Sequence, residues 1–150
     1  MEESIKIIAR NKKAGYEYFL SDFLECGIEL KGTEIKSIKN LAVSLQDSYV
    51  MIRNGEAYIV GMNISHYDKG NIFNHDPVRN RKLLMHKHEI FKLAQKVKEQ
   101  GYTLVATKIY LKKGKAKLEI ALGKGKKLYD KRETEKQKVQ NSIIKNYKTL

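Results

Sequence analysis

The densest chemistry in the sequence is a cluster of lysines near its C-terminus. Lys124, Lys126 and Lys127 alternate with glycine in the run Gly123-Lys124-Gly125-Lys126-Lys127. Because glycine adds no side chain and permits many backbone conformations, both the ammonium groups and the backbone can approach a phosphate closely. The run therefore predicts phosphate binding. It lacks the glycine spacing and the closing Ser or Thr of a Walker loop, so it does not predict nucleotide hydrolysis.

The positive charge continues through the rest of this tail. Residues 123–150 hold nine Lys or Arg and three Asp or Glu, which is six of the chain's thirteen net positive charges. The further cations that we expect to bind a polyanion are Lys131, Arg132, Lys136 and Lys138. Too few apolar residues accompany them to stabilise a helix alone. We expect the tail to be disordered until it meets its partner and to become helical there.

Catalytic and metal-binding patterns do not occur in the sequence. There is no GxSxG, HExxH or dinucleotide-binding fingerprint, and no nucleophile has an evident base. The four histidines, two of them at His86 and His88, lack the spacing of a zinc site, and Cys26 is the only cysteine. We therefore expect a protein that is not an enzyme and that holds no metal and no cofactor.

The overall charge indicates a polyanionic partner. The 150 residues include 30 Lys and Arg against 17 Asp and Glu, a formal net charge of +13. An anionic membrane is the weaker candidate, because no apolar run approaches the roughly 20 residues that a spanning helix needs. The opening Met1-Glu2-Glu3-Ser4 also lacks the pattern of a secretory signal. These features favour a cytoplasmic protein that binds nucleic acid.

The first half of the sequence predicts several short strands and one short helix. Residues 5–9 predict a strand, and residues 16–30 predict extended chain with a bend or bulge. Residues 32–38 predict a short helix capped by Thr33. Residues 47–53 and 56–64 predict a hairpin, because Asn54-Gly55 between them suits the two positive φ angles of a type I′ turn.

The second half of the chain repeats this arrangement after a loop. Residues 65–80 are polar and predict a loop, and residues 88–100 have the apolar spacing of an amphipathic helix that ends at Gly101. A second hairpin follows, with strands at 102–112 and 115–122 around Lys113-Gly114. Its second strand alternates, which places Lys117 on the solvated face.

Short strands and one helix between two hairpins favour a mainly β fold with short helices. The natural candidate is a small, partly open barrel of the oligonucleotide-binding (OB) class. We expect residues 1–122 to form this barrel and residues 123–150 to form the basic tail. Barrels of this class bind nucleic acid through strand faces and loops, which agrees with the charge.

Three stretches carry a resemblance to a known family. The first joins Ala9-Arg10-Asn11-Lys12-Lys13-Ala14 to Tyr16-Glu17-Tyr18-Phe19 and Gly32-Thr33-Glu34-Ile35-Lys36-Ser37. The second is Asn74-His75-Asp76-Pro77-Val78-Arg79-Asn80-Arg81-Lys82-Leu83-Leu84, and the third is Gly123-Lys124-Gly125-Lys126-Lys127-Leu128-Tyr129-Asp130-Lys131-Arg132. In this order and spacing the chain resembles the bacterial SsrA-binding protein family, also called small protein B.

The resemblance implies a function in ribosome rescue. Members of that family bind the tRNA-like domain of transfer-messenger RNA (tmRNA) and deliver it to stalled ribosomes for trans-translation. The tail is thought to enter the empty messenger channel beside the decoding centre of the small subunit. The alternatives are another RNA-binding module of the OB class, such as a ribosomal protein or an RNA chaperone, and an enzyme that acts on RNA.

The resemblance also implies roles for individual residues. Glu25, Leu84 and Lys117 match positions that contact the tRNA-like domain, and Tyr129 matches a position beside the decoding centre. A carboxylate at Glu25 would accept hydrogen bonds from base amines or a 2′-hydroxyl, because phosphate repels it. Tyr129 would stack on a base. The sequence leaves open whether Leu84 contacts RNA or belongs to the core.

Overall fold

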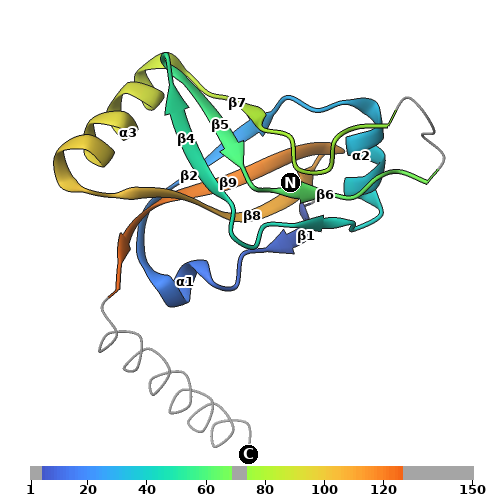
Figure 1. The fold of residues 1–150 in the computed structure, drawn as a ribbon, viewed down its shortest axis with the longest axis horizontal. Helices are drawn as coiled ribbons and strands as arrows, with labels where there is room; N and C mark the ends of the chain where they lie inside the picture. The colour runs from blue at the N-terminus through green and yellow to red at the C-terminus, as the bar shows by residue number, and fades with distance from the viewer. Residues whose placement is uncertain (1–4, 69–73, 127–150) are drawn as a thin grey trace, which may run out of the picture.

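A computed structural model describes residues 5–68 and 74–126 of the chain. The described residues form nine strands and three helices (Figure 1). In chain order these elements are β1 (Ile5–Arg10), α1 (Ala14–Glu17), β2 (Tyr18–Ile28), α2 (Gly32–Lys39), β3 (Val43–Ser44), β4 (Tyr49–Arg53), β5 (Glu56–Val60), β6 (Asn63–Ile64), β7 (Arg81–Leu84), α3 (Lys87–Gln100), β8 (Thr103–Lys112) and β9 (Lys115–Gly125).

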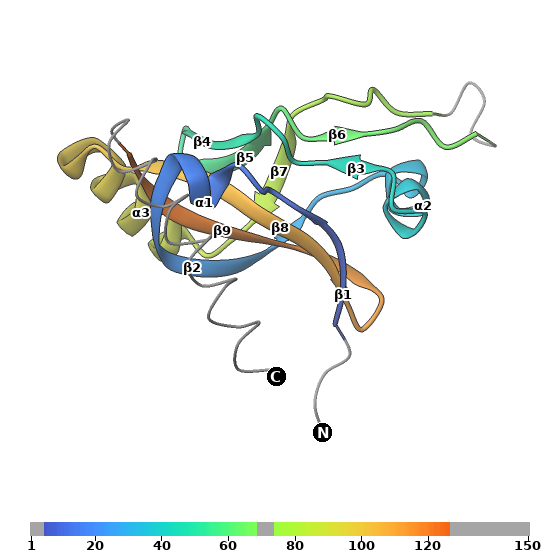
Figure 2. The ribbon, with the colours of Figure 1, turned by 90° about the horizontal axis from the view of Figure 1, so that it is seen from below.

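Seven of the strands form one curved antiparallel sheet. Its order is β1-β8-β9-β2-β7-β5-β4, and β3 pairs with β6 in a separate ribbon. The edge strand β4 packs against β8 without pairing to it, so the sheet curls back on itself but does not close. Helices α2 and α3 lie at opposite ends of this sheet (Figure 2). The predicted mainly β fold with short helices and a partly open barrel is confirmed.

Both predicted hairpins form, because their turn residues suit the required backbone. Asn54 and Gly55 have φ of 53° and 75°, and Lys113 and Gly114 have φ of 52° and 76°. Two consecutive positive φ angles are the requirement of a type I′ turn, whose twist matches that of the flanking strands. The strands β4 and β5 therefore pair in a continuous antiparallel ladder, and β8 and β9 pair antiparallel with one register shift between Ala106 and Lys108.

The predicted bulge lies in β2. The register against β9 shifts between Ser21 and Leu24, and Asp22 has a φ of 52°. The carboxylate of Asp22 forms an ion pair with Lys96 of α3, which ties the bulge to that helix. The prediction of extended chain from residue 16 is wrong at its start, because Tyr16 and Glu17 belong to α1.

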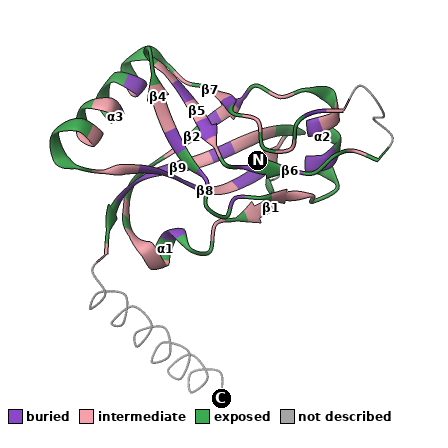
Figure 3. Ribbon diagram, in the orientation of Figure 1, coloured by how far each residue is buried: buried purple, intermediate pink, exposed green. Residues whose placement is uncertain are grey.

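The core is formed by alternate residues of the strands (Figure 3). In β9 the side chains of Leu118, Ile120 and Leu122 are buried, whereas Lys117 and Glu119 are half-buried. Helix α3 covers one end of the barrel with Ile90 and Leu93. It ends at Gly101, whose φ of 71° is the left-handed conformation that a helix end favours.

Two local predictions need correction. Thr33 does not cap α2: the helix begins after Lys31, whose backbone N–H donates to the Glu34 carboxylate at 2.8 Å. The strand β9 continues to Gly125, so Gly123, Lys124 and Gly125 pair with β2 although we assigned them to the tail. In the described parts of the chain, no helix is long and apolar enough to cross a membrane.

Candidate nucleic-acid interface

Three residues that the resemblance singled out lie together on the outer face of the sheet. Gly27 of β2 is the register partner of Leu84 on β7 and of Lys117 on β9. Directly opposite residues of antiparallel strands project from the same face, about 5 Å apart. Glu25 precedes Gly27 by two positions on β2 and therefore shares this face. We call the face that carries Glu25, Leu84 and Lys117 the outer face.

Glu25 is held in place by two neighbours. Its carboxylate accepts a hydrogen bond from the Tyr110 hydroxyl, and the Nζ of Lys112 lies 3.5 Å from both carboxylate oxygens. The Glu25 side chain is 36% exposed. An ionised carboxylate has about four lone-pair sites, so it can accept bonds from a ligand while it holds these partners.

Tyr110 contacts the charged side chains of Glu25 and Lys108. It is 4% exposed, and Lys108 lies over its ring with Nζ 5.7 Å from the ring centre. Burial, and then the hydrogen bond to Glu25, raises the pKa of Tyr110 well above its ordinary value. The hydroxyl therefore stays protonated and donates to Glu25. Truncation of Glu25 would leave this buried donor without its acceptor, at a cost of about 1–3 kcal/mol.

Leu84 belongs to the surface and not to the core. Its side chain is 54% exposed, whereas Leu83 beside it is 1% exposed. A Cβ atom placed on Gly27 would lie 3.3 Å from the Cβ of Leu84, so the glycine lets Leu84 lie across β2. An exposed leucine on a polar sheet face is available to pack against a base or a sugar.

Lys117 completes the outer face with a positive charge. It is half-buried between Gly27 on one side and Tyr110 on the other. Among the described residues no carboxylate forms an ion pair with it, and its neighbour Lys108 is already paired with Glu119 at 3.3 Å. The outer face thus offers a hydrogen-bond acceptor, an apolar side chain and an ammonium group on three adjacent strands, with Leu84 and Lys117 two strand spacings, or about 10 Å, apart.

The predicted phosphate-binding lysines form a second group at the far end of β9. Lys124 is exposed and lies opposite Phe19 of β2. Seven strand residues separate it from Lys117, which corresponds to about 23 Å. The structure therefore does not bring Lys124 and Lys126 together with Glu25, Leu84 and Lys117.

Lys126 is anchored rather than free. Its Nζ lies 3.0 Å from the carbonyl oxygen of Gly15 and 4.9 Å from the centre of the Phe19 ring. Its backbone N–H donates to the carbonyl of Glu17 at 2.9 Å. These contacts fasten the last described residue to α1 and β2. The other predicted tail residues, Lys127, Tyr129, Lys131, Arg132, Lys136 and Lys138, lie outside the described residues.

A buried ion network was missed by sequence reasoning. Glu34 of α2 and Arg81 of β7 are both 0% exposed and form an ion pair. Arg79 binds the second carboxylate oxygen of Glu34 at 2.5 Å. Arg81 also donates to the carbonyl of Met62 at 2.9 Å. The network fixes the start of the strand that ends at Leu84. The only signal in the sequence was that Glu34 and the two arginines fall within separate stretches of the family resemblance.

A second clamp joins the same two stretches. His75 is 2% exposed, with Nδ1 2.9 Å from the hydroxyl of Thr33 and Nε2 2.8 Å from the carbonyl of Ile64. The rings of His86 and His88 stack on each other, with their centres 5.6 Å apart. In residues 5–68 and 74–126, no three His, Cys, Asp or Glu side chains gather where they could hold a metal ion.

Comparisons with known proteins agree with this geometry. The family model described as "SmpB protein" matches residues 8–149. The chain is 57% identical to an SsrA-binding protein of Caldicellulosiruptor bescii over 132 residues, covering 88% of this chain and 84% of that protein. It is 51% identical to an SsrA-binding protein of Halothermothrix orenii over 148 residues, covering 98% and 96%.

A solved structure has the same fold. It is titled "tmRNA-SmpB: a journey to the center of the bacterial ribosome" and superimposes with a TM-score of 0.67 at 42% sequence identity. The match covers 80% of this chain and 85% of that one.

Proposed function

The chain belongs to the SmpB protein family, and on that premise we propose that it binds the tRNA-like domain of tmRNA and delivers it to stalled ribosomes for rescue by trans-translation. The observation that carries the proposal is the outer face, on which register pairs Leu84 and Lys117 with Gly27 and alternation adds Glu25. Their chemistry suits RNA, because bases, sugar hydroxyls and phosphates each find a matching group there.

We propose a division of labour between the barrel and the tail. The barrel, assigned to residues 1–122 with β9 running on to Gly125, binds the tRNA-like domain. The tail carries Tyr129 and the cations Lys131, Arg132, Lys136 and Lys138 into the decoding centre and messenger channel of the small ribosomal subunit, and Lys127 is proposed to bind RNA phosphate. The protein acts in the cytoplasm as a binding factor and catalyses no reaction.

Lys124 and Lys126 stand between these two parts. The exposed Lys124 is proposed to bind phosphate. For Lys126 we propose a structural role, since its contacts with Gly15, Glu17 and Phe19 hold the last described residue against α1 and β2.

Capture of the bound RNA tests the proposed function. The tagged full-length protein is purified from its own cells, and the RNA that accompanies it is sequenced. We expect one dominant species, tmRNA, with ribosomal RNA enriched when translation is stalled on messages without stop codons. Ribosomal RNA alone would indicate a ribosomal protein, and a broad mixture would indicate an RNA chaperone or an enzyme acting on RNA. Either of these results would overturn the proposal.

Replacement of Lys117 should change the salt dependence of RNA binding. Loss of one phosphate contact in Lys117→Ala is expected to flatten the slope of log K against log [salt] by about 0.7–0.9. Titrations of the tRNA-like domain at several salt concentrations measure this slope. The matched variant is Glu25→Gln, which removes the charge of a base or sugar contact but keeps an acceptor for Tyr110. It should weaken binding and leave the slope nearly unchanged. Equal slopes for wild type and Lys117→Ala would contradict a phosphate contact.

A further inference from the structure

Register extends the outer face one strand further, to Glu56. Ala57 of β5 pairs with Leu83 of β7, so Glu56 comes next to Leu84 on the same face. On its other side Glu56 pairs with Arg53 of β4. We propose that Glu56 and the hollow beside it bind one unpaired RNA base through an amino group on that base. This inference rests on the proposed function and adds a binding site to it.

The hollow lies between the β4–β5 turn, β7 and the start of α3. Its volume is about 390 Å³, within the range of small-molecule sites. Apolar side chains of Leu84, Met85 and Ile90 line it, together with the polar or charged residues Glu56, Lys82, His86 and Lys87. Gly55 adds no side chain at the turn, and nothing lies within 4 Å of the position that a Cβ would take there. Leu84 thus belongs to both the hollow and the outer face.

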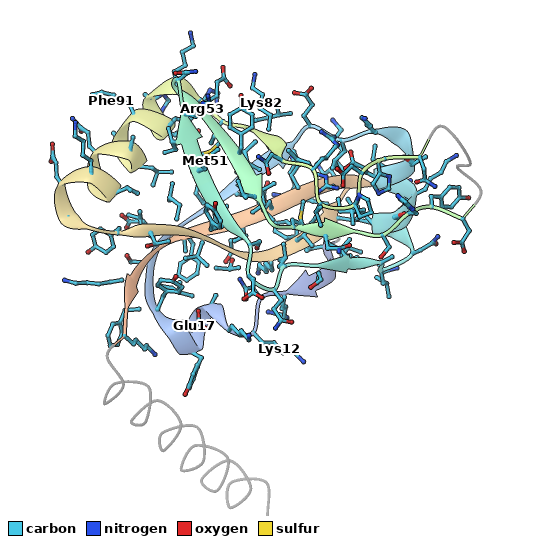
Figure 4. All side chains as sticks on the ribbon, in the orientation of Figure 1. Lys12, Glu17, Met51, Arg53, Lys82 and Phe91 are labelled. Atoms are coloured by element: carbon cyan, nitrogen blue, oxygen red, sulfur yellow. The ribbon has the colours of Figure 1, made fainter. Side chains whose placement is uncertain are left out.

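The carboxylate of Glu56 favours a base over a backbone phosphate at its side of the hollow. Glu56 Oε2 lies 3.0 Å from the Nζ of Lys82, and the two side chains are 38% and 40% exposed. Glu56 and Lys82 neutralise each other, and Lys87 adds a positive charge to the lining of the hollow. The Glu56 carboxylate itself repels a phosphate, whereas an amino group on a base can donate to it. Figure 4 shows Lys82 at the same end of the sheet as Arg53, which flanks Glu56 from the other strand. The ion pair with Lys82 holds the Glu56 carboxylate in place.

An RNA base matches the remaining groups of the hollow, which are a hydrogen-bond acceptor, apolar side chains and an aromatic ring. The free lone pairs of the Glu56 carboxylate can accept hydrogen bonds from an amino group of adenine, cytosine or guanine. Leu84 and Met85 provide apolar contact for the ring. His86, which already stacks on His88 with an interplanar angle of 15°, presents a flat ring on which a base can stack. Uracil has no amino group and is expected to bind least well.

Whether one substitution, Glu56→Gln, weakens or tightens RNA binding tests the inference. Glu56→Gln removes a negative charge and keeps the side-chain shape. If Glu56 serves only as the partner of Lys82, the substitution makes the protein more positive and binding of RNA should become tighter. If Glu56 accepts from a base, binding of a tmRNA tRNA-like-domain transcript should weaken about tenfold, the loss typical of a charged hydrogen bond. The matched control is Glu99→Gln, an exposed acid at the far end of α3, which should bind as the wild type does or slightly more tightly.

Abasic transcripts identify the base. An abasic nucleotide is placed at each unpaired loop position of the tRNA-like domain in turn, and each transcript is titrated with wild type and with Glu56→Gln. At one position, originally occupied by an amino-bearing base, the two losses should not add, because both remove the same contact. Unchanged or tighter binding by Glu56→Gln, or additive losses at every position, would overturn the inference. The proposed function would still stand if Lys117→Ala weakened binding in the same assay, and would fall if the wild type bound no better than it binds an unrelated RNA.

Discussion

Removal of residues 131–150 is expected to abolish rescue of stalled ribosomes and to leave binding of the tRNA-like domain intact. The deleted segment carries six Lys or Arg against two Glu, and the contacts proposed for the tRNA-like domain lie on β2, β7 and β9 instead. Without these cations the protein cannot neutralise the phosphates of the messenger channel. Rescue is measured as addition of the tag peptide in a translation reaction programmed with a message that has no stop codon.

Two variants bracket this result. Lys117→Ala with a complete tail should show the opposite pattern, with weakened binding of the tRNA-like domain and rescue that recovers when the RNA is supplied in excess. A tail of the same length in which each of the six cations is replaced by Gln should behave like the truncation, because charge and not length is lost. Failure of the truncated protein to bind the tRNA-like domain would refute the division of labour between barrel and tail.

Replacement of Glu34 by alanine is expected to cause the largest loss of stability of any single substitution discussed. Glu34→Ala leaves Arg81, which is 0% exposed, as a buried charge without its counter-ion. Breaking a buried ion pair in this way typically costs about 3–5 kcal/mol, a large part of the roughly 5–15 kcal/mol that stabilises a domain. Thermal unfolding should therefore begin about 6–20 °C lower. Glu99→Ala, which removes an exposed acid, should change stability by less than about 0.5 kcal/mol.

The same residue should give the stability a characteristic dependence on pH. Burial alone would raise the pKa of Glu34, but hydrogen bonds from Arg79, the backbone of Lys31 and Arg81 outweigh it and lower the pKa below its ordinary value. A carboxyl with a lowered folded-state pKa stabilises the protein fully above its unfolded pKa, near 4.3, and progressively less as the pH falls below that value. Urea unfolding between pH 6 and pH 3 should show a steeper loss in the wild type than in Glu34→Ala. Parallel curves would mean that folding does not lower the pKa of Glu34.

The hairpins and helix ends could be predicted from the sequence because they depend on local backbone preferences. Asn54-Gly55 and Lys113-Gly114 adopt positive φ angles whatever the strands pack against. Gly101 ends α3 because it too adopts a positive φ. The alternation of residues 115–122 likewise placed Lys117 on the outside before its neighbours were known. The prediction failed where a side chain had a distant partner: Thr33, expected to cap α2, binds His75 instead.

What brings Glu25, Leu84, Lys117 and Glu56 to one face is decided by the tertiary structure. Their strands pair in the order β9-β2-β7-β5. A register shift of one residue in any of these pairings would move the side chains of a whole strand to the opposite face of the sheet. Local preferences do not specify that order, because it depends on which apolar faces pack together and on a buried network whose members, Glu34 and Arg81, are 47 residues apart. The sequence by itself determined the kind of partner through its charge and the local turns through its glycines. Which charges are free to meet that partner depends on long-range pairing, since Lys126 is held by α1 while Lys117 is not.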